Sequence, residues 1–385
     1  MRYIALDLDK KHAFRGTFDT ETQQRQQERL PLMTDVASLK EFLSSLRPDD
    51  VIAMEAQPGS FYLHDLCKPI VKEVHILESH WLGPILNSAE DKTDRNDTGT
   101  MLDLMRANVL HTVWVPTPEV RAQRLVATHY RSLDKQRTRC INRIHALLRD
   151  HGLVLDADKL LKADATAVVR RLKDSMPPAA LSVLASTIRL LRRIEDELSI
   201  ADAQLQSTVQ PQREIAMTLP GLGAVLGSAA LAAIGDVTRF KSPDSLTNYT
   251  LAPSLKTTGG KPRHGKTKRR GSSLLRWAMV SAANCARRVP GPLRDTYIKL
   301  RRRGKGHDKA IVALARKMVE ILWHMLTKNE PYRNTPSAAE KRKQRRTQRK
   351  LDNAQQVLKN KPDTIDTLRQ NMSSIREVFQ IMASH

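Results

Sequence analysis

Four acidic residues in the first hundred positions have the type and spacing that phosphate chemistry with a divalent cation requires. Asp7 and Glu55 each end an apolar run, and Asp94 and Asp97 stand three residues apart. That spacing places both aspartates on one side of a helix. Mg²⁺ takes oxygen ligands and is held by a few carboxylates together with the substrate phosphate. We therefore expect the four acids to be catalytic Mg²⁺ ligands, with Mn²⁺ as a substitute.

Each acid also has an ordinary structural explanation when it is taken alone. Asp7 could close a turn, with Asp9 as a competitor beside it, and Asp94 could cap its own helix. Taken jointly, the acids favour the metal site, because they end two core strands and open a helix. A first strand, a fourth strand and a later helix carry the acids of an RNase H-like domain in this order.

Composition points to a polyanion as the partner. The chain has 385 residues and a formal net charge of +23, with a pI near 10.2. Nucleic acid is the first candidate and an anionic membrane surface is the rival. No run of 18 apolar residues is present, so no spanning helix and no membrane partner are expected. Three scattered cysteines, without a signal peptide, favour a reducing cytoplasm and argue against a zinc site.

The first 116 residues alternate between strand and helix patterns, which predicts an α/β domain with a mostly buried sheet. The run at 51–55 is continuously apolar, as in a strand that is buried on both faces. Helices are predicted at 38–46, 59–70 and 94–108, and strands at 3–9, 12–17, 27–32, 51–55, 74–77 and 112–115.

Two long helices are predicted next, over 118–150 and 178–210. Thr117 and Pro118 supply an N-cap and a proline at the first helical position. Apolar residues of the second helix recur at three and four, which is typical of a coiled-coil arm over 117–212. Two helices of an ordinary bundle explain the same pattern equally well.

Residues 213–332 form a mainly helical domain. The turn Leu219-Pro220-Gly221-Leu222-Gly223 precedes an alanine-rich helix, as in a helix-hairpin-helix motif. There the N–H groups of Gly221 and Gly223 would meet a DNA phosphate. A plain pair of antiparallel helices is the alternative. Two further helices are predicted at 273–286 and 308–327.

A basic loop over 256–271 interrupts this domain. It opens with Thr257-Thr258-Gly259-Gly260, where a hydroxyl beside two glycines could approach a phosphodiester closely. A solvated loop without function is the alternative. Its cations, which we expect to bind nucleic acid, are Lys261, Arg263, Lys266, Lys268, Arg269 and Arg270.

A basic helical tail over 333–385 ends the chain. A narrow apolar seam recurs at three and four from Ile365 to Met382. Such a seam needs a partner, either from this chain or from a second copy.

Several of these motifs resemble one known family. Tyr3-Ile4-Ala5-Leu6-Asp7, Glu55-Ala56 and Lys92-Thr93-Asp94-Arg95-Asn96-Asp97 are similar to the first motif block of the insertion sequence one-ten family of transposases. Leu219 to Gly223, Arg239-Phe240, Leu251-Ala252-Pro253 and Ala315-Arg316-Lys317 resemble its second block, in order. That family includes the Piv-like invertases and the bridge-RNA-guided recombinases.

The resemblance implies an RNase H-like (RuvC-like) DEDD domain, a coiled-coil arm and a transposase domain with a serine nucleophile. Thr258 stands where that serine is expected, with Ser254 as a nearby hydroxyl in a different register. The implied protein is a bacterial, cytoplasmic, nucleoid-associated recombinase. It forms a covalent protein–DNA intermediate, binds donor and target double-stranded DNA and a structured guide RNA, and works as a homodimer or homotetramer.

Two other functions fit the same residues. A Mg²⁺-dependent junction-resolving nuclease would use water and would need the four acids but not Thr258. A catalytically inactive nucleic-acid-binding derivative would need neither.

Overall fold

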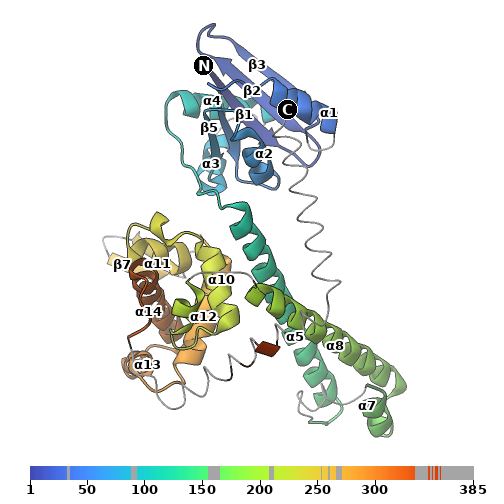
Figure 1. Ribbon diagram of the computed structural model, residues 1–385. Helices are drawn as coiled ribbons and strands as arrows, with labels where there is room; N and C mark the ends of the chain where they lie inside the picture. Colours follow the sequence, from blue (N-terminus) through green and yellow to red (C-terminus); the bar gives the residue numbers. More distant parts are fainter. Residues whose placement is uncertain are drawn as a thin grey trace. The chain divides into compact units, whose positions relative to one another are not determined.

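The computed structural model describes most of the chain and divides it into two compact units, Met1–Pro116 and Thr117–His385 (Figure 1). The described residues are 1–32, 35–87, 93–154, 165–207, 212–252 and 271–333, the backbone of 254–258 and 261–265, and positions 346, 349, 352, 353 and 356. The predicted tail helix from Ile365 onward, and most of the basic run before it, lie outside these residues.

A five-stranded mixed sheet forms the centre of the first unit. Its strands are β1 (Arg2–Leu8), β2 (Ala13–Asp19), β3 (Arg25–Leu30), β4 (Val51–Glu55) and β5 (Glu73–Leu77), in the order β3-β2-β1-β4-β5. The first three strands pair antiparallel, whereas β4 and β5 run parallel to β1. The apolar run of β4 lies beside β1 and is buried on both faces, as its composition predicts.

Helices cover both faces of this sheet. They are α1 (Val36–Ser44), α2 (Ser60–Cys67), α3 (Ser79–Leu86) and α4 (Asp94–Arg106). Helix α4 packs on β1 and β2, where Ala5, Ala53, Met101 and Leu102 share one apolar core. Helix α1 lies on the other face, because the Arg15 guanidinium stacks over its Phe42 ring.

The last predicted strand of this unit, at 112–115, is wrong. Only a single bridge joins Thr112 to Leu77, with backbone bonds from Glu78 N–H to His111 and from Val113 N–H to Ile76. The segment therefore follows the sheet edge without forming a ladder.

The second unit begins with two long helices, α5 (Pro118–Arg149) and α8 (Pro178–Ser207), which pack against each other. Leu148 near the end of α5 shares a core with Leu184 near the start of α8. Ala127 and Leu205, at the other ends, share a second core, so the two helices run antiparallel. The short helix α7 (Ala165–Leu172) packs on α8 and was not predicted.

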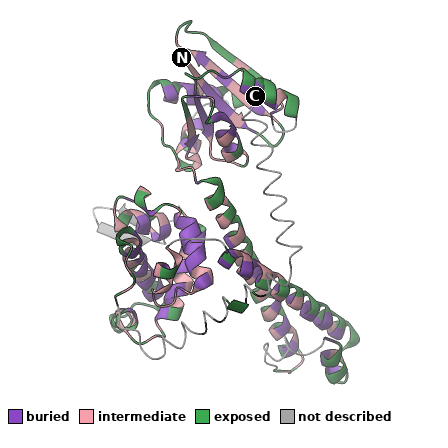
Figure 2. Ribbon diagram, in the orientation of Figure 1, coloured by how far each residue is buried: buried purple, intermediate pink, exposed green. Residues whose placement is uncertain are grey.

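The rest of this unit is a helical bundle around a continuous apolar core (Figure 2). Helix α13 and the short helices of the bundle were not predicted. The bundle contains α9 (Arg213–Met217), α10 (Ala224–Ile234), a 3-10 turn (Val237–Arg239), α11 (Pro243–Leu251), α12 (Ser273–Ala286), α13 (Pro292–Arg302) and α14 (His307–Lys328).

The basic segment between α11 and α12, predicted as a loop, contains a hairpin. Strand β6 (Ser254–Thr258) pairs antiparallel with β7 (Lys261–Gly265), and Thr258 stands opposite Lys261. Backbone pairing, which needs no apolar side chains, explains why the polar sequence concealed these strands. None of the helices in the described ranges is both long and apolar enough to cross a lipid bilayer.

Candidate active site

Asp7 and Glu55 lie side by side at the carboxyl ends of two neighbouring parallel strands. Leu6 of β1 pairs with Met54 of β4, so the next residue of each strand is an acid. Side chains alternate between the faces of a sheet. Ala5 belongs to the core under α4, and Asp7, two residues on, therefore points to the same face.

Helix α4 brings the other two acids to this edge. The Thr93 hydroxyl caps the helix by accepting from the Asn96 N–H at 3.2 Å. Asp94 begins the helix and is exposed, whereas Asp97 retains 7% exposure. One turn further on, Thr98 and Leu102 press against Gly16 of β2. The tight contact at Gly16 fixes how closely the acid-bearing turn approaches the sheet.

The charge environment of Asp7 includes the other three acids. Burial, the negative charge of Asp94 and the smaller effects of Asp97 and Glu55 together raise the pKa of Asp7 to about 6. A hydrogen bond from Gln57 Nε2 to Asp7 Oδ1, 3.4 Å long, opposes this rise. Like charges disfavour ionisation of a buried carboxylate. Three separate segments therefore concentrate negative charge at one point.

The donor set fits a hard divalent cation in type, although the side chains are not closed around one position. Within the described ranges, no three His, Cys, Asp or Glu side chains stand close enough to hold an ion together. The raised pKa of Asp7 nevertheless shows that its three acidic neighbours are within electrostatic reach. Carboxylates that repel one another stand apart unless a cation neutralises them.

Asp9, the competitor of Asp7, has a local role. It is exposed, and its carboxylate accepts from the Lys10 N–H at 2.6 Å while its own N–H donates to the His12 carbonyl. These bonds tie Asp9 into the turn between β1 and β2.

The glycine turn between α9 and α10 packs against another helix. Gly221 has φ +89°, and a Cβ there would meet the Ala282 carbonyl oxygen of α12 at 2.2 Å. Helix packing therefore accounts for Gly221 by itself. Gly223 caps α10 and has open space around its Cα. The binding of DNA phosphate by these two glycines stays a prediction.

The remaining predicted site residues are described only in part. Thr258 ends β6, and Lys261 and Arg263 lie in β7, but only the backbone of these strands is described. Lys92 of the K-T-D motif lies outside the described residues, as do Lys266, Lys268, Arg269 and Arg270. The acids and Thr258 belong to different units of the chain.

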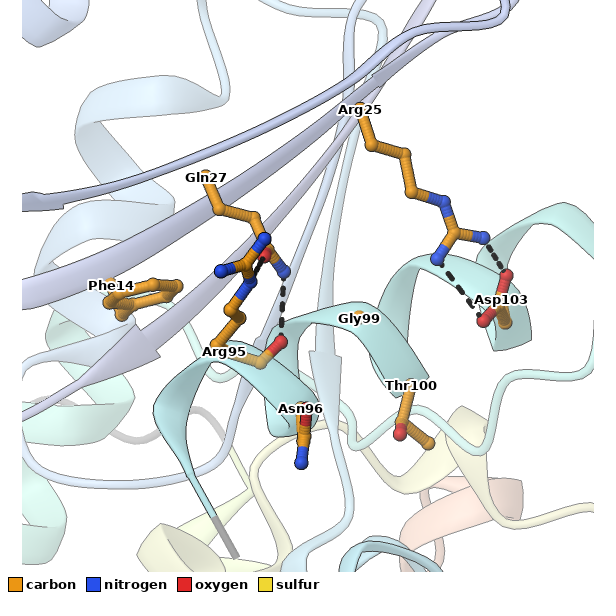
Figure 3. Close-up of a pocket in the computed structure, with 8 residues that line it drawn as sticks. All are labelled: Phe14, Arg25, Gln27, Arg95, Asn96, Gly99, Thr100 and Asp103. Atoms are coloured by element: carbon orange, nitrogen blue, oxygen red, sulfur yellow. Dashed lines mark hydrogen bonds and ion pairs between the residues drawn. The ribbon is translucent and has the colours of Figure 1, made fainter. Parts of the chain in front are cut away.

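Sequence reasoning missed the neighbours of the acids. Gln57 lies two residues after Glu55 and donates to Asp7, and Phe14 stands directly opposite Asp7 in the β1–β2 ladder. A polar pocket beside Phe14 runs between β3 and the first turns of α4 (Figure 3). The alternating burial of residues along β2 indicates which face Phe14 occupies. It does not show that Phe14 lies opposite Asp7, because this depends on the pairing of β2 with β1 and on its register.

Known proteins resemble this chain both over residues 213–299 and over most of its length. Residues 213–299 match the family described as Transposase IS116/IS110/IS902 family. A probable family 20 transposase of Pseudomonas aeruginosa is 26% identical over 315 residues, which cover 77% of this chain and 89% of that protein.

Two other relatives extend the comparison. The transposase for insertion sequence element IS1111A of Coxiella burnetii is 24% identical over 324 residues, 80% of this chain and 84% of its own. An uncharacterized 44.8 kDa protein of insertion element IS116 from Streptomyces clavuligerus is 30% identical over 178 residues. That match spans 45% of this chain and less than half, 44%, of the relative.

Proposed function

Because the chain belongs to the IS116/IS110/IS902 family of transposases, we propose that it is a DNA transposase that cuts and exchanges strands at the four acids. The observation that carries this proposal is that Asp7 and Glu55 end two paired parallel strands while Asp94 and Asp97 lie in the first turn of α4. Burial and the charges of Asp94, Asp97 and Glu55 together raise the pKa of Asp7 to about 6, which supports it. The first strand, the fourth strand and a later helix supply these acids, which supports an RNase H-like assignment for the first unit.

In this proposal Asp7, Glu55, Asp94 and Asp97 hold Mg²⁺. The bound cation would neutralise charge on the scissile phosphate and lower the pKa of the attacking hydroxyl. Asp7 must be ionised to contribute, and Gln57 favours its ionised form through the hydrogen bond to Oδ1. Asp97, at 7% exposure, is the most buried of the four.

The Thr258 hydroxyl is the proposed nucleophile, by its position in the family's motif. Its oxygen attacks phosphorus, the bond to the strand's 3′-oxygen breaks, and the hydroxyl proton passes to that leaving oxygen. A 3′-hydroxyl of the exchanged strand then displaces the threonine oxygen, which regains a proton. The energy of the phosphodiester is kept throughout, so ATP is not required.

The partners follow from this reaction. Two duplexes must be held and exchanged, so a homodimer or homotetramer is proposed, with Thr258 and the acids meeting within one chain or between subunits. A structured guide RNA is proposed from the family resemblance, together with donor and target DNA. The net charge of +23 supports a polyanionic partner but does not distinguish RNA from DNA.

A suicide DNA substrate tests the proposal. Incubation of the full chain with Mg²⁺ should give a covalent protein–DNA adduct, which Thr258→Ala should abolish and Thr258→Ser should retain. Serine lacks the β-methyl group that restricts χ1, so its hydroxyl turns more freely. Ser254→Ala is the matched control and should leave the adduct intact.

The other results of this assay are equally informative. Free cleaved ends without an adduct, in wild type and in Thr258→Ala alike, would indicate a nuclease that uses water. Neither product would indicate a nucleic-acid-binding derivative. If Ser254 were essential and Thr258 dispensable, the assignment of the nucleophile would be wrong.

The cations of the hairpin and of the segment after it are proposed to bind the DNA backbone. Replacing Lys266, Lys268, Arg269 and Arg270 by alanine should flatten the dependence of log affinity on log salt by roughly 0.9 for each phosphate that these side chains neutralise. An unchanged slope would place the segment away from the backbone.

A further inference from the structure

A row of side chains leads from the acids to the edge of the sheet. The β1–β2 register pairs Asp7 with Phe14, and the β2–β3 register pairs Phe14 with Arg29. Residues directly opposite in antiparallel strands point to the same face. An acid, an aromatic ring and a cation therefore stand in line across two strand spacings, about 10 Å.

The pocket beside this row is large enough for one nucleotide. It has a volume of about 600 Å³ and opens between β3 and α4 (Figure 3). It combines an aromatic ring, two amides and two guanidinium groups with one carboxylate. These groups belong to Phe14, Gln27, Asn96, Arg25, Arg95 and Asp103.

Two of the pocket groups hold each other in place. Arg95 Nε donates to Gln27 Oε1 at 2.9 Å, and Gln27 Nε2 donates back to the Arg95 carbonyl at 2.8 Å. The guanidinium and the amide are thus fixed across the pocket wall, as the dashed contacts in Figure 3 show. A ligand that meets prearranged groups loses less entropy in ordering them on binding.

The charges of the pocket favour an anion near Phe14. The one carboxylate, Asp103, is paired with Arg25 and lies 3.5 Å from Arg106. Arg95 adds a second guanidinium group to the pocket lining, and Arg29, outside the lining, stands opposite Phe14 on the edge strand. The cations of the lining therefore outnumber its one carboxylate.

We propose that this pocket binds an unpaired nucleotide next to the phosphate that is cut, in the DNA strand held at the acids. The inference rests on the proposed function, because that function places the phosphate beside Asp7. A base can stack on an exposed ring only when its face is not covered by neighbouring bases. Phe14 would stack on the face of the base, Asn96 would bond its edge, and Arg95 or Arg29 would bind the adjoining phosphate.

Photo-crosslinking of the full chain tests the site directly. A short single strand of DNA, with one thymine replaced by 5-iodouracil, is irradiated with the protein, and the crosslinked peptides are identified by mass spectrometry. The proposal expects Phe14 among the crosslinked residues. Phe14→Leu should reduce crosslinking to the peptides of this pocket about tenfold, because base–aromatic stacking contributes that order of affinity.

Matched variants and substrates separate the alternatives. Tyr62→Leu removes another aromatic side chain of the same unit, 47% exposed on α2, and should leave the crosslink unchanged. Thermal melting confirms that each variant is folded. Equal crosslinking by blunt duplex DNA, by RNA alone, or only outside this pocket would overturn the proposal.

Variants of the acids distinguish a failure of this inference from a failure of the proposed function. Asp97→Asn should stop cleavage and keep the Phe14 crosslink. If wild type cuts DNA through its acids but never crosslinks at Phe14, the pocket assignment alone is wrong. If acid variants cut at the normal rate, the proposed function is wrong, whatever the crosslinks show.

Discussion

The two ends of β1 and β4 carry acidic residues that the fold treats in opposite ways. At the amino end, Asp50 has 0% exposure and accepts hydrogen bonds from Arg2 Nε at 2.8 Å and Nη2 at 2.6 Å. The Arg47 N–H adds a third bond at 2.8 Å. The hydrogen bond to Asp50 raises the pKa of Arg2 above its usual value.

At the carboxyl end of the same strands, the neighbours of Asp7 are acids. Its pKa rises to about 6 because burial and the charges of Asp94, Asp97 and Glu55 oppose ionisation. A buried carboxylate that is paired with a cation is compatible with a stable fold. Several carboxylates close together destabilise the fold, because their charges repel one another. A charge arrangement that does not serve folding indicates a functional site.

The largest expected effect is on catalysis at the carboxyl end. Asp97→Asn should slow strand cleavage roughly a thousandfold or more, since the cation's contribution to phosphoryl chemistry amounts to several kcal/mol. DNA binding should persist, because one charge of a +23 excess is small. Cleavage assays with gel-shift binding measure both. Glu41→Gln, an exposed acid on α1, is the control that should remain active.

The amino end should respond in stability instead. Asp50→Ala leaves Arg2 without its partner and should destabilise the first unit by about 3–5 kcal/mol, which thermal or urea unfolding measures. Replacing Arg2 and Asp50 together by leucine should recover most of that loss. A marginal change in the single variant would show that the buried pair is not structural.

The pH dependence should distinguish the two ends further. Because the pKa of Asp7 is raised to about 6 from 3.8, the native state binds more protons than the unfolded chain between these values. Stability should therefore fall as pH rises through about 6, by on the order of 1 kcal/mol after solvent screening is allowed for.

Melting curves across this range and up to neutral pH, with and without Mg²⁺, measure this change. Asp7→Asn should remove the dependence, and Mg²⁺ should reverse its sign, because a bound cation favours the ionised carboxylate. A flat profile in the wild type would remove the evidence for crowded charge at Asp7.

The smallest expected effect concerns Gln57. Its bond to Asp7 Oδ1 is long, at 3.4 Å. Gln57→Ala should therefore move the midpoint of the cleavage pH profile upward by less than about one pH unit. A downward movement would contradict its role in favouring the ionised form.

The sequence predicted those elements whose signal is local. The run Val51–Glu55 matches β4 residue for residue, because continuous burial leaves only apolar side chains there. The pair Asp94 and Asp97 likewise located the start of α4, although Thr93 caps the helix in place of Asp94. The apolar spacing also predicted the two long helices, whose antiparallel packing comes from the structure, while a coiled-coil supercoil stays a prediction.

What the sequence could not supply depends on long-range pairing. Phe14 stands beside Asp7 only because β2 pairs antiparallel in one register. Gln57 reaches Asp7 across 50 positions of the chain. The strands β6 and β7 escaped prediction because Lys256 and Arg263 pair through their backbone and give no apolar alternation. Register and turn geometry decide such contacts, and composition does not.

The close contact between Gly16 and α4 limits the distance between this helix and the sheet. An added Cβ would lie 3.1 Å from both Thr98 Cβ and Leu102 Cδ1, so an alanine at this position would require these side chains to move by a few tenths of an ångström. The distance of Asp97 from the sheet thus depends on Gly16, which has no side chain. A survey of natural variants that considers only reactive side chains would overlook Gly16. Yet Gly16 contacts the helix that carries Asp94 and Asp97.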